Sequence, residues 1–152
     1  MKRLIAILLT LSFSFNSFAY ASLMYPLALI VKSEGAWSGF FTVIGTLVGF
    51  LGGIYIPIGS LADSISGVMK CTPIIYGTSM FRKVMTKSIL DSTFQGVPVD
   101  IVDEYREIMG IQLRVADYTL TLRDEWLILL ACGIIFLVIG MCLLKYEKKM
   151  DR

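Results

Sequence analysis

The sequence predicts an all-α membrane protein with three transmembrane helices. Between the second and third it predicts a re-entrant or extracellular helical hairpin and a small extracellular region. The 152-residue chain is 56% hydrophobic, and only 17% of its residues are charged, whereas soluble domains carry roughly 25% charged residues. Its apolar residues gather in three uncharged blocks, at 4–31, 37–58 and 126–144. About 20 apolar residues cross the hydrocarbon core, so each block is long enough to span a membrane.

The first block has two interpretations. A basic start, a short apolar stretch and Ala19-Tyr20-Ala21 are together typical of a cleaved secretory signal. Cleavage after Ala21 would leave too short an apolar segment before Lys32 to cross a bilayer. As one helix, the block would be about 42 Å long, enough to cross with a tilt or with a kink at Pro26. We therefore expect an uncleaved span over 4–31, with the cleaved two-span product as the alternative.

The second block contains a regular row of glycines. Gly45, Gly49 and Gly53 recur every four residues, a spacing that places them on one face of a helix and lets another helix backbone approach closely. Glycine is also simply more frequent in membrane helices than in soluble ones. Because three glycines share the register, we predict that this face is a helix-packing surface.

The segment after the second block is predicted to form a helical hairpin over 59–90. Pro57 ends the preceding span, and Ser60 with Asp63 fits a capping box at the start of the next helix. That helix is too short and too polar to cross the bilayer. It either dips into the outer leaflet and returns, which requires surrounding protein or a wet cavity, or it lies on the membrane surface as an amphipathic helix.

The region at 91–125 is predicted to lie outside the cell. Within it, residues 98–110 fit a short helix that Asp100 caps and Gly110 ends. Apolar and polar residues then alternate on both sides of Ala116-Asp117, which favours a small β-hairpin.

The charges at the C-terminus set the expected topology. The third span at 126–144 is followed by a basic tail at 145–152, and the positive-inside rule places such a tail in the cytoplasm. We therefore expect a multi-pass protein of the cell membrane with a cytoplasmic C-terminus. Three spans then place Lys2 and Arg3 outside, against the same rule, which suggests a chain that lacks preceding spans.

One long segment carries a family resemblance. Residues 45–85 read GTLVGFLGGIYIPIGSLADSISGVMKCTPIIYGTSMFRKVM, and they resemble the C-terminal half of the permease subunits of type-2 ABC exporters. GFLGGIYIPIGSL is similar to the Gly-rich turn and Pro-containing run that end the fifth span of those permeases. TPIIYGTSMFR, with Pro73 and Tyr76, is similar to their P-x-x-Y element, which leads into the second helix of the re-entrant hairpin. Ala62 stands where those permeases often carry a proline.

The resemblance implies a function and partners. It implies a C-terminal permease fragment with the last three spans, which contributes part of the substrate pathway and a permease–permease packing surface to an ATP-driven exporter. The implied partners are a cytoplasmic ATP-binding subunit, a second permease half or copy, and the lipid bilayer. The alternative is a small autonomous membrane protein that assembles with or regulates other membrane helices.

The residue types limit the chemistry. The sequence contains no histidine and no P-loop, so we expect a transport subunit rather than an enzyme, with no cofactor or metal and with ATP hydrolysis left to a partner. Basic residues form no long run, so nucleic-acid binding is not expected. Arg82 and Lys83 are predicted to extend toward lipid headgroups rather than to bind an anion. The carboxylates between Asp100 and Glu107 are interpreted as the solvated face of a helix.

Overall fold

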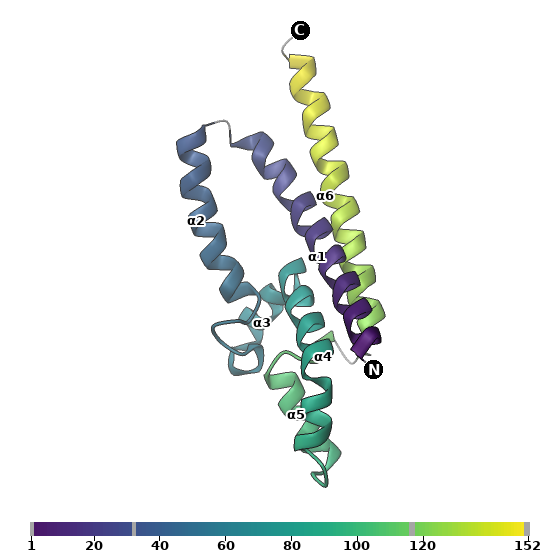
Figure 1. Ribbon diagram of the computed structural model, residues 1–152. Coiled ribbons are helices and arrows are strands. Elements are labelled where there is room, and N and C mark those ends of the chain that lie inside the picture. The colour runs from purple at the N-terminus through teal and green to yellow at the C-terminus, as the bar shows by residue number, and fades with distance from the viewer. Residues whose placement is uncertain (1, 32, 116–117, 151–152) are drawn as a thin grey trace.

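The computed structural model describes residues 2–31, 33–115 and 118–150. Three long helices dominate it (Figure 1), and each is long and apolar enough to cross a membrane, over Arg3–Ile30, Glu34–Leu51 and Leu122–Tyr146. This confirms the predicted helical fold class at the level of its three spans. The elements in chain order are α1 (Lys2–Ile30), α2 (Glu34–Leu51), the 3₁₀ turn η1 (Ile58–Ser60), α3 (Asp63–Lys70), α4 (Pro73–Thr93), α5 (Val99–Ile108), β1 (Arg114–Val115), β2 (Tyr118–Thr119) and α6 (Leu122–Met150).

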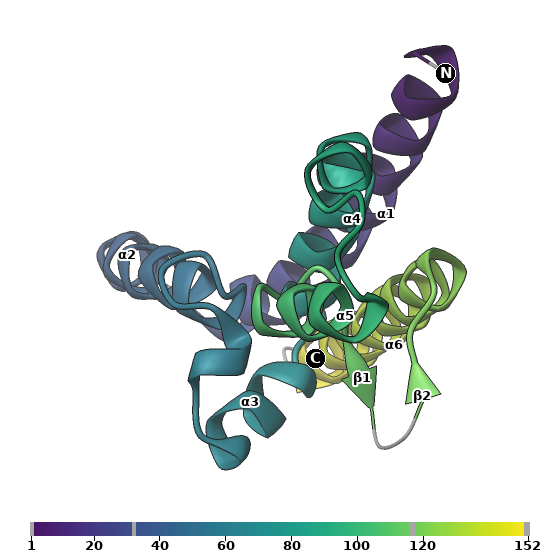
Figure 2. The same cartoon turned by 90° about the horizontal axis from the view of Figure 1, so that it is seen from below.

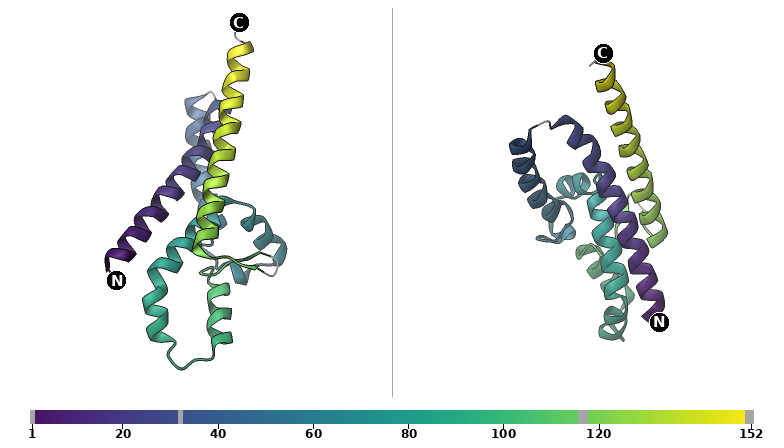
Figure 3. Two further views of the ribbon diagram at one scale, coloured as in Figure 1. Left: turned by 90° about the vertical axis from the view of Figure 1, so that its right-hand side faces the viewer. Right: turned by 45° about the horizontal axis from the view of Figure 1, so that its top comes forward.

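Helices α1 and α6 form a parallel pair, and α2 runs in the opposite direction beside α1 (Figures 1 and 3). The C-terminal end of α6 therefore lies on the same side as the connection between α1 and α2. Elements α3, α4 and α5 lie toward the opposite side (Figure 1). If all three long helices cross a bilayer, the C-terminal ends of α1 and α6 and the start of α2 share one face of it.

Small residues bring α1 and α6 together. A Cβ atom added at Gly133 would collide with the ring of Phe18, and one added at Gly140 would collide with the ring of Tyr25. On the α1 side, Ala19 is fully buried. Close backbone approach through small residues is how membrane helices commonly associate, because lipid gives no hydrophobic driving force between them.

Helix α2 ends earlier than predicted. Its last residue is Leu51 rather than residue 58, and Gly53 follows the helix with a φ of 65°, a left-handed conformation that glycine adopts without strain. Gly53 therefore lies outside the helix that holds Gly45 and Gly49. The predicted row of three glycines on one helix face is wrong for its third member.

The hairpin segment contains two helices after a short turn. Pro57 precedes η1, Ser60 ends it, and Leu61 is extended before α3 begins at Asp63. The residue that caps α3 is Ala62, and it makes no side-chain capping hydrogen bond. The capping box of Ser60 and Asp63 is therefore wrong, because the extended residue at 61 separates the two turns.

The region at 91–125, which was predicted to lie outside the cell, contains one short helix and one β-hairpin. Pro98, rather than Asp100, occupies the N-cap of α5, and Asp100 lies in the first turn, where its charge still favours the helix dipole. Gly110 follows the helix with a φ of 63°, as its predicted role in ending the helix requires. Strands β1 and β2 pair antiparallel, with Val115 opposite Tyr118, and the predicted turn residues Ala116 and Asp117 lie outside the described residues.

The best-buried part of the molecule lies where α4 meets α1, α6 and the hairpin. Among the apolar side chains that are almost completely buried there are Ala19 of α1, Ile75 and Met80 of α4, Leu113 before β1, and Leu129 of α6. By contrast, α2 contributes a single buried residue, Gly49. Seen from below, α2 lies away from α6, and α5 is drawn between them (Figure 2). Helix α6 continues through most of the predicted tail, to Met150.

Candidate functional site

Helix α4 begins about halfway along α1. The hydroxyl of Tyr20 donates a hydrogen bond to the carbonyl of Ile74 at 3.3 Å. One turn further, Gly77 lies so close to the Asn16 side chain that a Cβ atom would collide with its amide oxygen. Because Asn16 is the middle residue of α1, the start of α4 lies deep beside this helix.

A polar anchor, which we define as Ser79, Lys83 and Glu125, joins α4 to the start of α6. The Ser79 hydroxyl donates to Oε1 of Glu125 at 2.7 Å, and Lys83 Nζ forms an ion pair with the same oxygen at 2.8 Å. The Glu125 side chain is completely buried, and its second oxygen, Oε2, has no hydrogen-bond partner among the described residues. Removing a charge from water is costly unless it is paired, so the buried Glu125 carboxylate depends on Lys83 and Ser79 as its partners.

The anchor also reaches the loops. Besides Glu125, Lys83 Nζ donates to the carbonyl of Leu120 at 2.7 Å. The Ser79 hydroxyl lies 3.1 Å from the carbonyl of Ile111. Ile111, Leu120 and Glu125, which all lie well after α4 in the sequence, are thus fixed to one face of this helix.

Arg82 and Thr78 connect α4 to the end of α2. The guanidinium of Arg82 donates to the carbonyl of Gly53 at 2.7 Å and to that of Met109 at 3.0 Å. The Thr78 hydroxyl donates to the carbonyl of Gly52 at 2.8 Å. Burial lowers the pKa of Arg82 from its ordinary value. The prediction that Arg82 and Lys83 extend toward headgroups is wrong, because both side chains turn inward to bind backbone carbonyls.

An apolar cleft separates α1 from α2. It has a volume of about 490 Å³ and carries no charged residue in its lining. Residues 71–74, which lead from α3 into α4, and Phe136 of α6 also line it. Its side walls come from both helices and include Leu23, Met24 and Leu27 of α1 and Phe41, Gly45 and Val48 of α2.

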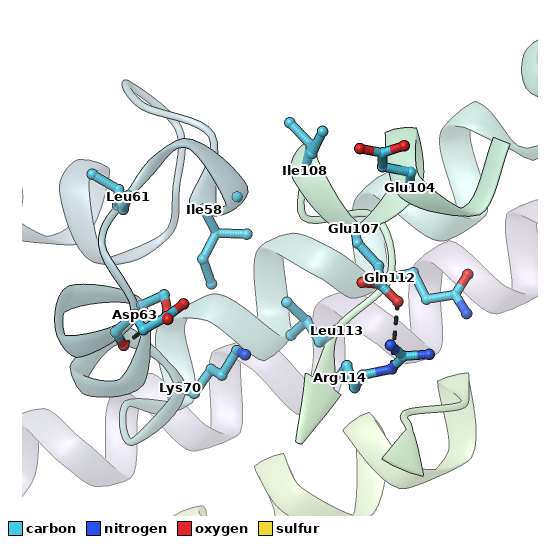
Figure 4. Close-up of a pocket in the computed structure, with 12 residues that line it drawn as sticks. Ile58, Leu61, Asp63, Lys70, Glu104, Glu107, Ile108, Gln112, Leu113 and Arg114 are labelled. Atoms are coloured by element: carbon cyan, nitrogen blue, oxygen red, sulfur yellow. Dashed lines mark hydrogen bonds and ion pairs between the residues drawn. The ribbon is translucent and has the colours of Figure 1, made fainter. Parts of the chain in front are cut away.

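A second cavity, of about 280 Å³, lies between the α3 side of the molecule and α5 (Figure 4). Its lining mixes signs, with Asp63, Lys70, Glu104, Glu107 and Arg114 around apolar side chains. Glu107 pairs with Arg114 at 3.5 Å. Three of these side chains are acidic and two are basic, so the cavity carries charges of both signs rather than a strong field of one sign.

The three glycines of the predicted packing surface have different surroundings. Gly45 lines the cleft and has open space where a Cβ atom would be. Gly49 is covered by the ring of Tyr55, which follows it in the same chain. The carbonyl of Gly53 accepts a hydrogen bond from Arg82. The structure therefore does not bring them together as one surface.

The predicted hairpin residues lie along the path from α2 to α4. Pro57 and Ser60 flank η1, and Asp63 opens α3. Pro73 is the first residue of α4, where its fixed φ and missing N–H are well tolerated. Tyr76 lies one turn later and donates from its hydroxyl to the carbonyl of Lys70, so it ties the end of α3 to α4.

Sequence reasoning missed the anchor and the glycines of α6. Ser79 and Lys83 are four residues apart, a spacing that places them on one helix face, but nothing local reveals that Glu125 completes the set. Gly133 and Gly140 are seven residues apart in the third block. That repeat is the signal from which their packing role could have been inferred.

Within the described ranges, no group of three or more histidine, cysteine or acidic residues could hold a metal ion. Comparisons of the chain with protein-family models, with curated proteins and with solved structures find no match. The resemblance to exporter permeases therefore rests on the sequence segments quoted above.

Proposed function

We propose that this chain is a transmembrane subunit, and a C-terminal fragment, of an ATP-driven ABC exporter. It contributes three spans to the substrate pathway, together with an outer unit that consists of α3, α5 and the β-hairpin of β1 and β2. A separate cytoplasmic ATP-binding subunit hydrolyses ATP. The second half of the permease, or another copy, completes the pathway. The chain is a multi-pass protein of the cell membrane with its C-terminus in the cytoplasm.

The observation that carries this proposal is the position of α4. Its first turns lie beside the middle of α1, next to Tyr20 and Asn16, while its later residues bind the loops around α5 and β2. One helix thus contacts all three spans and the outer unit. This is the connection that a re-entrant hairpin needs if movements of the spans are to open a path on the outer side.

A second candidate is a small autonomous partner of other membrane helices. The observation in its favour is the exposure of α2, which buries only Gly49 within this chain. Gly39 and Gly45 both have open space at the Cβ position, so another helix could approach either of them closely.

Purification of the tagged chain from its own host in mild detergent tests the proposal. We expect a complex that contains a nucleotide-binding subunit and further permease spans, with ATPase activity that depends on the complex. An unrelated three-span protein with the same tag is the control. A chain that purifies alone, or with a membrane protein and no nucleotide-binding subunit, would overturn the exporter proposal and favour the second candidate.

A cysteine lock tests the role of α4 within such a complex. Thr78→Cys and Gly52→Cys, in a background without native cysteines, place two thiols where α4 binds the end of α2. If the two elements must move relative to each other, oxidation stops export and a reductant restores it. Each single variant is the control. Export that continues in the oxidised double variant contradicts a mechanical role for this contact.

A further inference from the structure

We propose that α3 lies in the membrane–water interface, on the side of the bilayer where α5 is found, with Ile65 and Val68 inserted among the lipids. This inference stands on the faces and the position of α3 and does not depend on ATP-driven export. It assigns the bilayer as the partner of a surface that the described part of the chain leaves uncovered.

Helix α3 has one polar and one apolar side, because successive residues of an α-helix are rotated by about 100°. The polar side carries Asp63, Ser66 and Lys70, which all line the second cavity. The apolar side carries Ile65 and Val68, which are 51% and 61% exposed. A short helix divided in this way is typical of helices that lie along an apolar surface.

The position of α3 places it at the boundary of the membrane. Helix α2 ends at Leu51 and α6 begins at Leu122, and both are long and apolar enough to span a bilayer. Figures 1 and 3 show α3 at the height of these two ends, where a bilayer crossed by both helices would also end. Ile54 and Tyr55, which follow α2 closely, are exposed as well. Tyrosine is enriched at this depth, because its ring is apolar and its hydroxyl is polar.

The two sides of α3 are oriented as an interfacial helix requires. The second cavity separates α3 from α5, and Figure 4 shows Asp63 and Lys70 across it from Glu104 and Glu107. Helix α5 lies farther from the spans than α3 does (Figures 1 and 3). The polar side of α3 therefore faces away from the bilayer, and its apolar side faces back toward it. In this orientation the apolar side enters the boundary of the acyl chains while the charged side chains stay hydrated.

The residue types favour lipid over another membrane helix as the occupant. Membrane helices pack against each other through small residues that let their backbones approach closely, as α1 and α6 do at Gly133 and Gly140. Ile65 and Val68 are branched and would keep a second backbone at a distance. The glycine of α3, Gly67, lies toward the polar side of the helix, so it offers no close approach on the apolar side.

Spin labels at two neighbouring positions test the proposal. In a background of Cys71→Ala, Cys132→Ala and Cys142→Ala, Val68→Cys carries a label on the apolar side of α3. Gly67→Cys is the matched control, because it lies toward the polar side and has open space at its Cβ position. The labelled full chain is reconstituted into phosphatidylcholine vesicles. The collision rate of each label is measured with oxygen, which concentrates in lipid, and with a nickel chelate, which stays in water.

We expect the ratio of oxygen to nickel collisions to be several-fold higher for Val68→Cys than for Gly67→Cys. Ile65→Cys should give the same high ratio, and it keeps the test decisive if one variant fails to fold, which circular dichroism establishes. Equal ratios for Val68→Cys and Gly67→Cys would place both sides of α3 in water and overturn the proposal. A label on Val68→Cys that neither reagent reaches would show that protein covers this side, and it would overturn the proposal too.

Discussion

Lys83 and Glu125 form a buried ion pair, and replacing one of them should lower the free energy of unfolding by a different amount than replacing the other. Glu125 is completely buried, whereas the Lys83 side chain is 18% exposed. In Lys83→Met, the buried carboxylate loses its cation and keeps only the Ser79 donor, so it must stay charged without a partner or take up a proton. Removing one partner of a buried pair costs about 3–5 kcal/mol, and we expect this variant to fall in that range.

Glu125→Leu should destabilise the protein less. Its Lys83 partner already reaches water in part and can turn further outward, so the loss is nearer the about 1–3 kcal/mol of an unsatisfied polar group. When both charges are replaced, in Lys83→Met with Glu125→Leu, no buried charge remains. Such replacements are often neutral, so the double variant should be destabilised by less than Lys83→Met alone, far short of the about 4–8 kcal/mol to which the two single losses add.

The free energy of unfolding in detergent micelles measures this cycle. Trp126 stacks on Phe15, with the ring centroids 5.8 Å apart, so its fluorescence reports the separation of α6 from α1. Trp37→Phe removes the other tryptophan from the signal. If the two single losses simply add in the double variant, or if Glu125→Leu is the more damaging one, the assignment of the anchor as a buried pair is refuted.

Two further predictions concern packing around α1. Gly133→Leu should weaken the α1–α6 pair by about 1–3 kcal/mol, because its side chain would collide with Phe18; the same titration should show little change for Gly39→Leu, where the space is open. Gly77→Ala should be destabilised by a similar amount through its collision with Asn16. Adding Asn16→Ala should recover most of that loss, and a double variant that is no better than Gly77→Ala alone would show that the collision is not the cause.

The spans could be predicted from the sequence because hydropathy is a local property. Each uncharged block corresponds to one long helix, since every backbone group within a bilayer must be satisfied inside its own segment. The position at which a helix ends depends more on contacts with distant parts of the chain. Helix α2 stops at Leu51, and the carbonyls that follow it bind Thr78 and Arg82, residues that are distant in the sequence.

The anchor could not be predicted for the same reason. Glu125 directly precedes the third apolar block, and in sequence it looks like the charged boundary of a span. Its burial depends on Lys83 and Ser79, some forty residues earlier. The glycines illustrate the converse case. Periodicity drew attention to Gly45, Gly49 and Gly53, but the glycines at which two long helices approach closely are Gly133 and Gly140, in the third apolar block.

Helices α6 and α2 are attached to the rest of the molecule in different ways, and this difference determines which of them moves more easily. Helix α6 is held to α1 by close contacts along its length, as at Gly133 and Gly140, and changing such a contact requires repacking a dense interface. Helix α2 is tied to α4 by hydrogen bonds to the carbonyls of Gly52 and Gly53 at its end, and an apolar cleft lies along its α1 side. Segments with few buried contacts are the ones that open most readily. Movement of α2 against a fixed α1–α6 pair therefore changes the shape of the cleft first.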